Sequence, residues 1–238
     1  MEFIETLING LSIGSTYAMI ALGYTMVYGI AKMLNFAHGD VIMVAGYMIF
    51  VGLTVTGNPI VSFLVSVPLC ILLGITIEKI AYRPLRGASP LAVLITAIGV
   101  SYLLQSSAQM IFGSAPKMVT IADLGSISFS GLTIPVYVIV TLVCSVIIMA
   151  ALTLFVKYTR TGRAMIAVSE DKGAAQLMGI NVNRIIMITF AIGSGLAAFA
   201  GLFMLMKSPS LSNTLGAMPG IKAFTAAVIG GIGSIPGA

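Results

Sequence analysis

Charged side chains are scarce in this sequence of 238 residues, and long stretches lack them altogether. Only 8% of the residues are Asp, Glu, Lys or Arg, whereas soluble domains contain about 25%. No charged residue or histidine occurs in residues 6–31, 41–77, 87–116, 124–156 and 185–206. A membrane-spanning helix needs roughly 20 predominantly apolar residues. The sequence therefore predicts a protein that crosses a lipid bilayer several times, in agreement with its mean hydropathy of +1.10.

Residues that carry enzyme chemistry or bind metals are also few. His38 is the single histidine, and both cysteines, Cys70 and Cys144, lie in apolar stretches without zinc, haem or disulfide spacing. No Gly-x-x-x-x-Gly-Lys-Ser/Thr motif for nucleotide phosphates is present. Gly10-Leu-Ser-Ile-Gly14 has the letters of a nucleophile elbow, but its serine falls within a predicted apolar helix. We therefore expect a non-enzyme that binds no metal and no cofactor itself.

The apolar stretches predict an all-α fold, a polytopic transmembrane helix bundle with about six to seven spans in one domain, residues 1–238. Six spans are expected at residues 6–30, 41–57, 60–77, 91–112, 134–156 and 185–206. Asn58-Pro59, a turn signal, divides the stretch that is too long for one span. A seventh apolar segment begins after Lys222 and reaches Ala238 without a polar flank. We expect the natural protein to continue beyond Ala238.

Basic residues predict the orientation of the bundle, because short cytoplasmic loops are rich in Lys and Arg. With the N-terminus outside, nine basic residues fall in cytoplasmic loops: Lys32, Lys79, Arg83, Arg86, Lys157, Arg160, Arg163, Lys172 and Arg184. Three fall outside: Lys117, Lys207 and Lys222. The net charge of +5 is thus explained by topology rather than by nucleic-acid binding. Re-entrant segments at 35–40 or 216–238 would alter the number of spans but not these loops.

Small residues recur at four-residue spacing on two of the predicted spans. They are Gly10, Gly14 and Ala18 in the first span and Ala197 and Gly201 in the sixth. Flat faces of this kind let membrane helices approach closely. We expect packing within the bundle, with contact to a second subunit as the alternative.

No predicted span contains an acidic or basic residue, and His38 and Asp40 come closest to one, at the mouth of the second span in the stretch Asn35-Phe-Ala-His-Gly-Asp40. We predict that Asp40 caps a helix beginning at Val41 and favour this role over proton handling. His38 is expected to be a hydrogen-bonded residue at the membrane interface rather than a pH sensor. Coupling to protons or sodium ions is therefore weakly supported, and the role of Asn35, His38 and Asp40 stays open.

A long polar stretch, residues 157–184, forms the largest predicted cytoplasmic loop. Helix-forming residues predict one helix over 163–178, and Gly179 stands where a helix C-cap often lies. One face of this helix would be apolar, at Ala164, Ala167, Ala174, Leu177 and Met178, and Lys172 and Gln176 would point to water. A short amphipathic helix of this kind lies on lipid or docks into a partner's groove.

Motifs spread over the whole chain give a more specific indication. Gly173-Ala-Ala-Gln-Leu-Met-Gly179 has the spacing of the Glu-Ala-Ala-x-x-x-Gly pattern in ABC importer permeases, although Gly173 replaces the Glu and a later Leu-Pro is missing. Other stretches resemble branched-chain amino acid ABC permeases: Leu34-Asn-Phe-Ala-His-Gly-Asp40, Tyr82-Arg-Pro-Leu-Arg-Gly87, Thr161-Gly-Arg-Ala164, Gln176-Leu-Met-Gly-Ile-Asn181 and the run from Gly220 to Gly237. The chain thus resembles permease subunits of this family.

The resemblance implies partners for the chain in a bacterial or archaeal cytoplasmic membrane. These are a second permease, two cytoplasmic ATPases that bind ATP and Mg, and an extracytoplasmic solute-binding protein. Leucine, isoleucine and valine are the expected solutes, although close relatives carry urea or amides. An ATP-independent channel or facilitator for a small neutral solute is the alternative, and a purely structural membrane protein is a third hypothesis.

Two sets of residues are candidate functional residues, the first implied by this resemblance and the second chosen for polar side chains within the apolar spans. The ATPase-coupling loop would use Arg163, Asp171, Gly173, Ala174, Ala175, Leu177, Met178 and Gly179. Uncharged polar side chains that can line the solute path are Ser12, Thr16, Thr96, Ser101 and Gln105. For any single one of these five, a hydrogen bond to a neighbouring helix is the favoured alternative.

Overall fold

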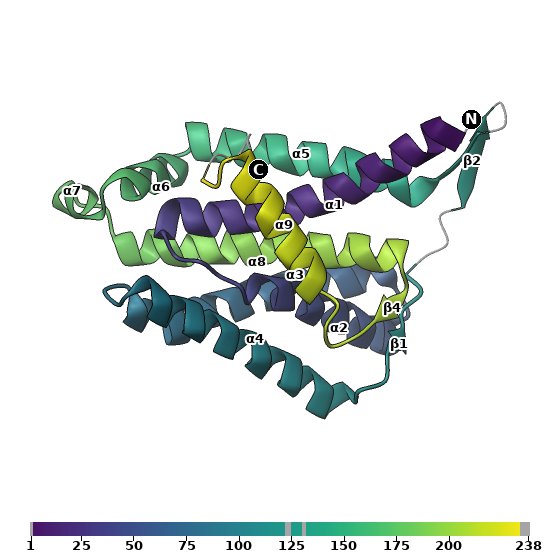
Figure 1. Cartoon of the computed structure of the whole chain (residues 1–238), viewed down its shortest axis with the longest axis horizontal. Coiled ribbons are helices and arrows are strands. Elements are labelled where there is room, and N and C mark those ends of the chain that lie inside the picture. The colour runs from purple at the N-terminus through teal and green to yellow at the C-terminus, as the bar shows by residue number, and fades with distance from the viewer. Residues whose placement is uncertain (1, 122–124, 130–131, 234–238) are drawn as a thin grey trace.

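The computed structural model describes residues 2–121, 125–129 and 132–233 and is a bundle of long helices (Figure 1). In this part of the chain, six helices are long and apolar enough to cross a membrane. They are α1 (Glu2–Ala31), α2 (His38–Thr56), α3 (Pro59–Ile77), α4 (Pro90–Phe112), α5 (Val136–Tyr158) and α8 (Val182–Lys207). A π-helical turn (Glu78–Tyr82) and a 3-10 turn (Arg83–Leu85) prolong α3. The predicted all-α membrane bundle is confirmed.

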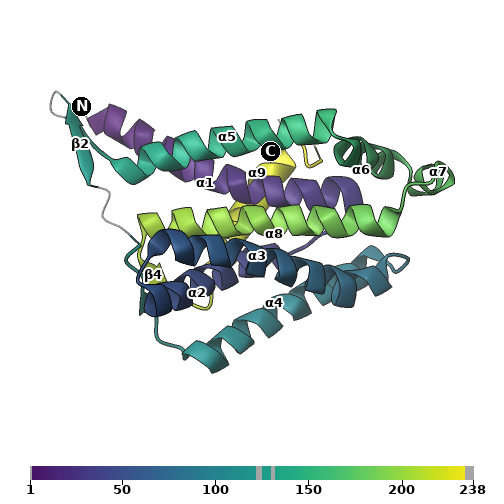
Figure 2. The ribbon, with the colours of Figure 1, turned by 180° about the vertical axis from the view of Figure 1, so that it is seen from behind.

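Short elements connect these long helices. The helices α6 (Arg160–Glu170) and α7 (Lys172–Leu177) follow α5, and α9 (Ala217–Gly230) follows α8. Strand β1 (Lys117–Met118) pairs antiparallel with β4 (Ser210–Leu211), and β2 (Ser126–Phe129) pairs antiparallel with β3 (Leu132–Pro135). Both strand pairs lie at the end of the bundle opposite α6 and α7 (Figures 1 and 2).

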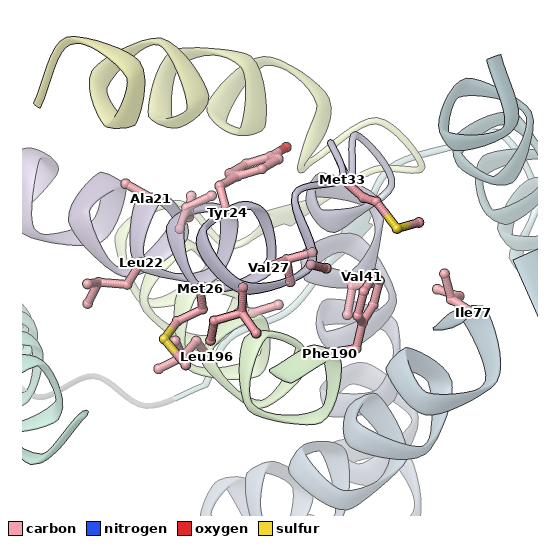
Figure 3. Close-up of a cluster of buried hydrophobic side chains, with 14 of the residues drawn as sticks. Ala21, Leu22, Tyr24, Met26, Val27, Met33, Val41, Ile77, Phe190 and Leu196 are labelled. Atoms are coloured by element: carbon pink, nitrogen blue, oxygen red, sulfur yellow. The ribbon is translucent and has the colours of Figure 1, made fainter. Parts of the chain in front are cut away.

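The core of the bundle lies around α1 and α8. Helix α8 packs against α1, α2 and α3, whereas α4 and α5 are mostly exposed at the sides (Figure 2). Phe190 and Leu196 of α8 meet Met26 and Val27 of α1 in a buried apolar cluster (Figure 3). The two central helices are therefore held by protein contacts, and α4 and α5 present apolar surfaces to lipid or to another subunit.

Small residues produce close helix contacts on α8 but not at the start of α1. A Cβ added to Gly201 would lie 2.9 Å from the carbonyl oxygen of Ile42, so α2 and α8 touch along their backbones. The expected packing within the bundle is confirmed there. Nothing lies within 4 Å of a Cβ added to Gly10 or Gly14. The prediction that these two glycines pack against another helix of the bundle is therefore wrong. Their face borders an apolar groove between α1 and α5 instead.

The turn between α2 and α3 forms as the sequence predicts. Gly57 ends α2 with a φ of 64°, a left-handed conformation that glycine adopts without steric cost. The Asn58 side chain accepts hydrogen bonds from the backbone N–H groups of Ile60 and Val61, and Pro59 opens α3. Polar capping and proline thus separate two helices within one apolar stretch.

Helix α2 begins inside the bundle rather than at one of its ends. Figures 1 and 2 show its first turn beside the middle of α8. The chain reaches this point through residues 32–37, which are not helical, after Lys32 has adopted a φ of 58°. A 2.9 Å hydrogen bond from the Tyr82 hydroxyl to Asn35 Oδ1 anchors this segment. Because α2 starts at His38, with Ala37 as its N-cap, the prediction that Asp40 caps a helix starting at Val41 is wrong.

Helix α9 also begins inside the bundle, against the start of α2. A Cβ on Gly216 would lie 1.7 Å from the carbonyl oxygen of Gly39, so the two backbones are in direct contact. With 14 residues, α9 is shorter than a full span, since it extends about 21 Å against a hydrocarbon core of about 30 Å. It starts before Lys222, not after it as predicted, and Lys222 lies within the helix. Residues 234–238 lie outside the described residues.

Candidate functional site

A cavity of about 370 Å³ lies between α4 and the inner ends of α2 and α9. Its volume falls within the usual range of small-molecule sites, about 300–1,000 Å³. Residues from α1, the 32–37 segment, α2, α4 and α9 line it: Tyr24, Phe36, Gly39, Asp40, Leu94, Ile98, Ser101, Tyr102, Gln105, Ala217 and Ile221. Residues distant in sequence thus meet where two helices begin within the bundle.

Asp40 and Gln105 form the polar part of this cavity. Gln105 Nε2 donates a 2.8 Å hydrogen bond to Asp40 Oδ1 and lies 3.2 Å from Ser101 Oγ, to which it also donates. The carboxylate is thereby tied to α4 across 65 residues of sequence. Ser101 and Gln105, both proposed from sequence for the solute path, lie together here, and the structure adds Asp40 and Tyr24 to them.

The other three residues considered for the path lie elsewhere. Thr16 lines a separate cavity of about 180 Å³, and its hydroxyl donates to the Ser12 carbonyl, 3.2 Å away. Ser12 itself is buried in α1. Thr96 is half-buried on α4 and does not line the cavity beside Asp40. The structure therefore brings two of the five residues together and leaves Ser12, Thr16 and Thr96 apart from them.

His38 lies inside the bundle and not at its surface. It is 1% exposed, and its ring packs edge-on to Tyr24, with ring centroids 4.9 Å apart. Gly23 makes room for the ring, since a Cβ there would lie 2.2 Å from His38 Nε2. This nitrogen has no hydrogen-bond partner among the described residues. Because the ring is buried, the prediction of an interfacial histidine is wrong.

The coupling loop consists of two helices instead of the single helix predicted over 163–178. The chain breaks at Asp171, whose Oδ1 accepts hydrogen bonds from the N–H groups of Gly173 and Ala174, at 2.7 and 2.9 Å. Asp171 is thus the N-cap of α7, and this local capping outcompetes a continuous helix. Gly179 follows α7 with a φ of 81°, which confirms its place at the helix end.

Side chains of α6 and α7 divide between the bundle and the exterior. Ala175, Met165 and Val168 are buried, whereas Leu177 and Met178 are 91% and 82% exposed. The other residues considered for coupling, Arg163, Asp171, Gly173, Ala174 and Gly179, are exposed. Lys172 does not point to water as predicted, because its Nζ donates a 2.8 Å hydrogen bond to the carbonyl oxygen of Ala31. The pKa of Lys172 is lowered by burial and by the charges of Arg86 and Lys32.

The structure also reveals a polar cluster at the same end of the bundle. Arg86 contacts Glu78 and Asn183 by hydrogen bonds and forms an ion pair with Glu78, whose side chain is 2% exposed. This cluster joins the end of α3 to the start of α8. From the sequence, Arg86 belongs to the Tyr82–Gly87 motif and to the basic residues that predict the cytoplasmic side, and nothing there indicates that it pairs with Glu78. Their separation by eight residues does not itself indicate a pair.

The helices, the buried polar groups and the exposed loop helices define the class of protein, a polytopic helical membrane protein with a cavity inside its bundle. Residues 6–238 match the family described as branched-chain amino acid transport system / permease component. The chain belongs to this family of transport permeases, which is not a family of catalytic enzymes.

Individual relatives resemble the chain over its full length. It is 43% identical to the high-affinity branched-chain amino acid transport system permease protein BraD of Pseudomonas aeruginosa. It is 41% identical to the permease protein LivH of the corresponding system of Escherichia coli. Both alignments cover 100% of this chain and 82% of the relative. The ribose import permease protein RbsC of Haemophilus influenzae is 27% identical over 96% of this chain and 69% of its own length. No solved structure matches the chain.

Proposed function

We propose that this protein is the permease subunit of an ABC importer for leucine, isoleucine, valine or related neutral amino acids. A second permease completes the solute path with it. Two cytoplasmic partner subunits bind ATP with Mg and hydrolyse it, and an extracytoplasmic binding protein delivers the solute. Support for the substrate class comes from relatives whose names specify branched-chain amino acid transport.

The exposed apolar tip of α7 is the observation that carries the proposed coupling. Leu177 and Met178 project from a helix whose start is fixed by Asp171 and by the bond from Lys172 to α1. Adjacent apolar side chains that are exposed together, outside the membrane-spanning helices, are typical of a surface that contacts another protein. In this proposal they enter a groove of the ATPase, so that movement of the ATPase reaches the bundle through α7.

The distribution of charge supports an orientation with the N-terminus outside a bacterial or archaeal cytoplasmic membrane. The ends of α1 and α3 and the start of α8 lie at the same end of the bundle as α6 and α7. Two hydrogen bonds connect these segments, from Lys172 to Ala31 and from Arg86 to Asn183. Basic residues are concentrated in these segments. Under the positive-inside rule, this end faces the cytoplasm.

Purification of the full-length protein with its partners tests the proposal. The tagged protein is extracted gently from its native membrane, and co-purifying ATPases and ATP hydrolysis are measured with binding protein, either free or loaded with leucine. We expect hydrolysis to rise with the loaded form. ATPases without a leucine response would assign another solute, and solute passage by the protein alone without ATP would indicate a facilitator.

A further inference from the structure

Asp40 is an acidic residue enclosed within the membrane-spanning part of the bundle. It is 1% exposed. Among the described residues, Arg86 and Glu78 form an ion pair, whereas no Lys, Arg or His side chain lies within ion-pair distance of Asp40. A buried charge is costly unless it is paired, and acidic groups inside membrane segments are usually functional. A cation that enters the cavity is the partner that Asp40 lacks.

The surroundings of Asp40 hold a carboxylate in place. It lies in the first turn of α2, where the helix dipole stabilises negative charge. The bond from Gln105 Nε2 to Oδ1 fixes its orientation. A carboxylate accepts about four hydrogen bonds in total. Asp40 therefore retains acceptor capacity for a ligand after binding Gln105.

The remaining walls of the cavity are largely apolar. Leu94 and Ile98 line it from α4, Ile221 lines it from α9, and Phe36 lines it from the 32–37 segment. Such walls give no favourable contact to a hydrated metal ion but suit a branched aliphatic group. One acidic group beside an aliphatic pocket is complementary to an ammonium group that carries a branched aliphatic chain.

We propose that Asp40 binds the α-ammonium group of the translocated amino acid, while its aliphatic side chain packs against Leu94, Ile98 and Ile221. Gln105 is a positioning residue that orients the Asp40 carboxylate. This inference rests on the proposed function and adds to it a binding site inside the permease, separate from the site of the binding protein. The site selects for a primary ammonium with an aliphatic substituent.

Protection of a cysteine in the cavity tests the site directly. Ile98, which is 44% exposed, is replaced by Cys, and Cys144 by Ala, in the complete importer without binding protein. The rate of labelling by a small maleimide is then measured in the presence of one of three compounds. These are leucine, 3-methylbutylamine, which lacks the carboxylate, and 4-methylpentanoate, which lacks the ammonium. We expect the first two compounds to slow labelling and the acid to have no effect. Equal protection by the acid, or no protection by leucine, would overturn the proposal.

Substitution of Asp40 gives a second, independent measurement. Asp40→Asn keeps the size of the side chain but removes its charge, so protection by 3-methylbutylamine should disappear. Leucine uptake by the complete importer should fall about tenfold or more, the loss expected from one charge-assisted hydrogen bond. The matched control is Ser106→Ala, an exposed position on α4 outside the cavity, which should transport normally.

The two measurements separate failure of the site from failure of the proposed function. If leucine gives no protection in Ile98→Cys with Asp40 present, and Asp40→Asn takes up leucine normally with ATP, the ammonium site is overturned and the importer stays intact. A wild-type complex that moves no leucine with ATP would overturn the proposed function. Protection by 3-methylbutylamine would still decide whether the cavity binds an aliphatic ammonium.

Discussion

Lys172 Nζ donates a 2.8 Å hydrogen bond to the carbonyl oxygen of Ala31, the last residue of α1. This bond connects α7, the proposed docking helix, to the point where the chain leaves α1 and enters the segment that leads to Asp40. Residues 32–37 separate the end of α1 from the start of α2. Displacement of α7 would therefore act first on the segment that carries Asn35 and Phe36, and next on the cavity.

Removal of this bond should weaken coupling more than folding. For Lys172→Met we expect roughly fivefold slower leucine uptake, the effect of about 1 kcal/mol from a partly exposed hydrogen bond. Membrane level should be unchanged, and Lys172→Arg should restore part of the rate. Transport is measured in vesicles with the complete importer. The exposed position Arg184 supplies the control, because Arg184→Met removes a nearby charge without breaking a bond to α1. Equal loss in both variants would contradict the role of the bond.

Lys172 should also titrate below the ordinary range of lysine. Burial disfavours its charged form, and the charges of Arg86 and Lys32 lower its pKa further. The folded state therefore carries the free-energy cost of a charged Lys172 at pH values below this lowered pKa. The cost falls as the pH rises through that pKa and the ammonium loses its proton. Lys32→Gln removes one repelling charge, so the pKa of Lys172 should rise, yet stay below normal because burial persists. The pH dependence of Lys172 acetylation, followed by mass spectrometry, measures both values. An unchanged midpoint in Lys32→Gln would exclude the influence of Lys32.

The exposed tip of α7 should be required for ATPase binding but not for folding. Leu177→Asp and Met178→Asp place charge on side chains that are 91% and 82% exposed, so thermal stability should change by less than about 0.5 kcal/mol. Co-purifying ATPase should nevertheless fall at least about tenfold, because a charge buried in an apolar groove is costly. The control is Ser114→Asp at the opposite end of the bundle. Normal ATPase recovery with both α7 variants would contradict docking at this tip.

Contact between the starts of α2 and α9 should tolerate no added methyl group. In Gly216→Ala the new Cβ would meet the Gly39 carbonyl at 1.7 Å, and backbone atoms cannot yield as a flexible side chain does. We expect loss of about 1–3 kcal/mol or failure to fold. Gly10→Ala is the matched control, since nothing lies within 4 Å of its Cβ and alanine favours the helix. Thermal unfolding in detergent compares them, and equal stability would mean that α9 is not held against α2.

Local sequence signals predicted the helices well but not where α2 starts. The lengths of the apolar stretches predicted the six spans, and Asn58-Pro59 and Gly179 predicted helix boundaries. These predictions succeed because spans and helix ends of this kind depend on neighbouring residues alone. Asp40 has the residue type of an N-cap, yet the bond between Tyr82 and Asn35 and the room at Gly23 for His38 let the helix begin earlier. These contacts join distant residues, so no local pattern encodes them.

The candidate site was predictable only in part for the same reason. Ser101 and Gln105 stood out as polar residues on an apolar helix, but nothing in their spacing indicates Asp40 as a neighbour 65 residues away. In the coupling loop, helix propensity favoured one continuous helix. The Asp171 side chain instead binds the N–H groups of α7 and starts a new helix. Such competition between a side chain and the backbone is decided by energies too small to read from sequence.

The ion pair between Glu78 and Arg86 gives a prediction about stability. Arg86→Met leaves the Glu78 carboxylate, which is 2% exposed, without its cation. Breaking a buried pair on one side typically costs about 3–5 kcal/mol. Because the cost arises from the charge left behind, Glu78→Gln combined with Arg86→Met should be more stable than Arg86→Met alone. Asn183→Ala removes an exposed neutral partner of Arg86 and should cost no more than about 1 kcal/mol. Thermal unfolding in detergent ranks the three variants by stability. If the double variant is no more stable than Arg86→Met, Arg86 stabilises the bundle through packing rather than through its charge.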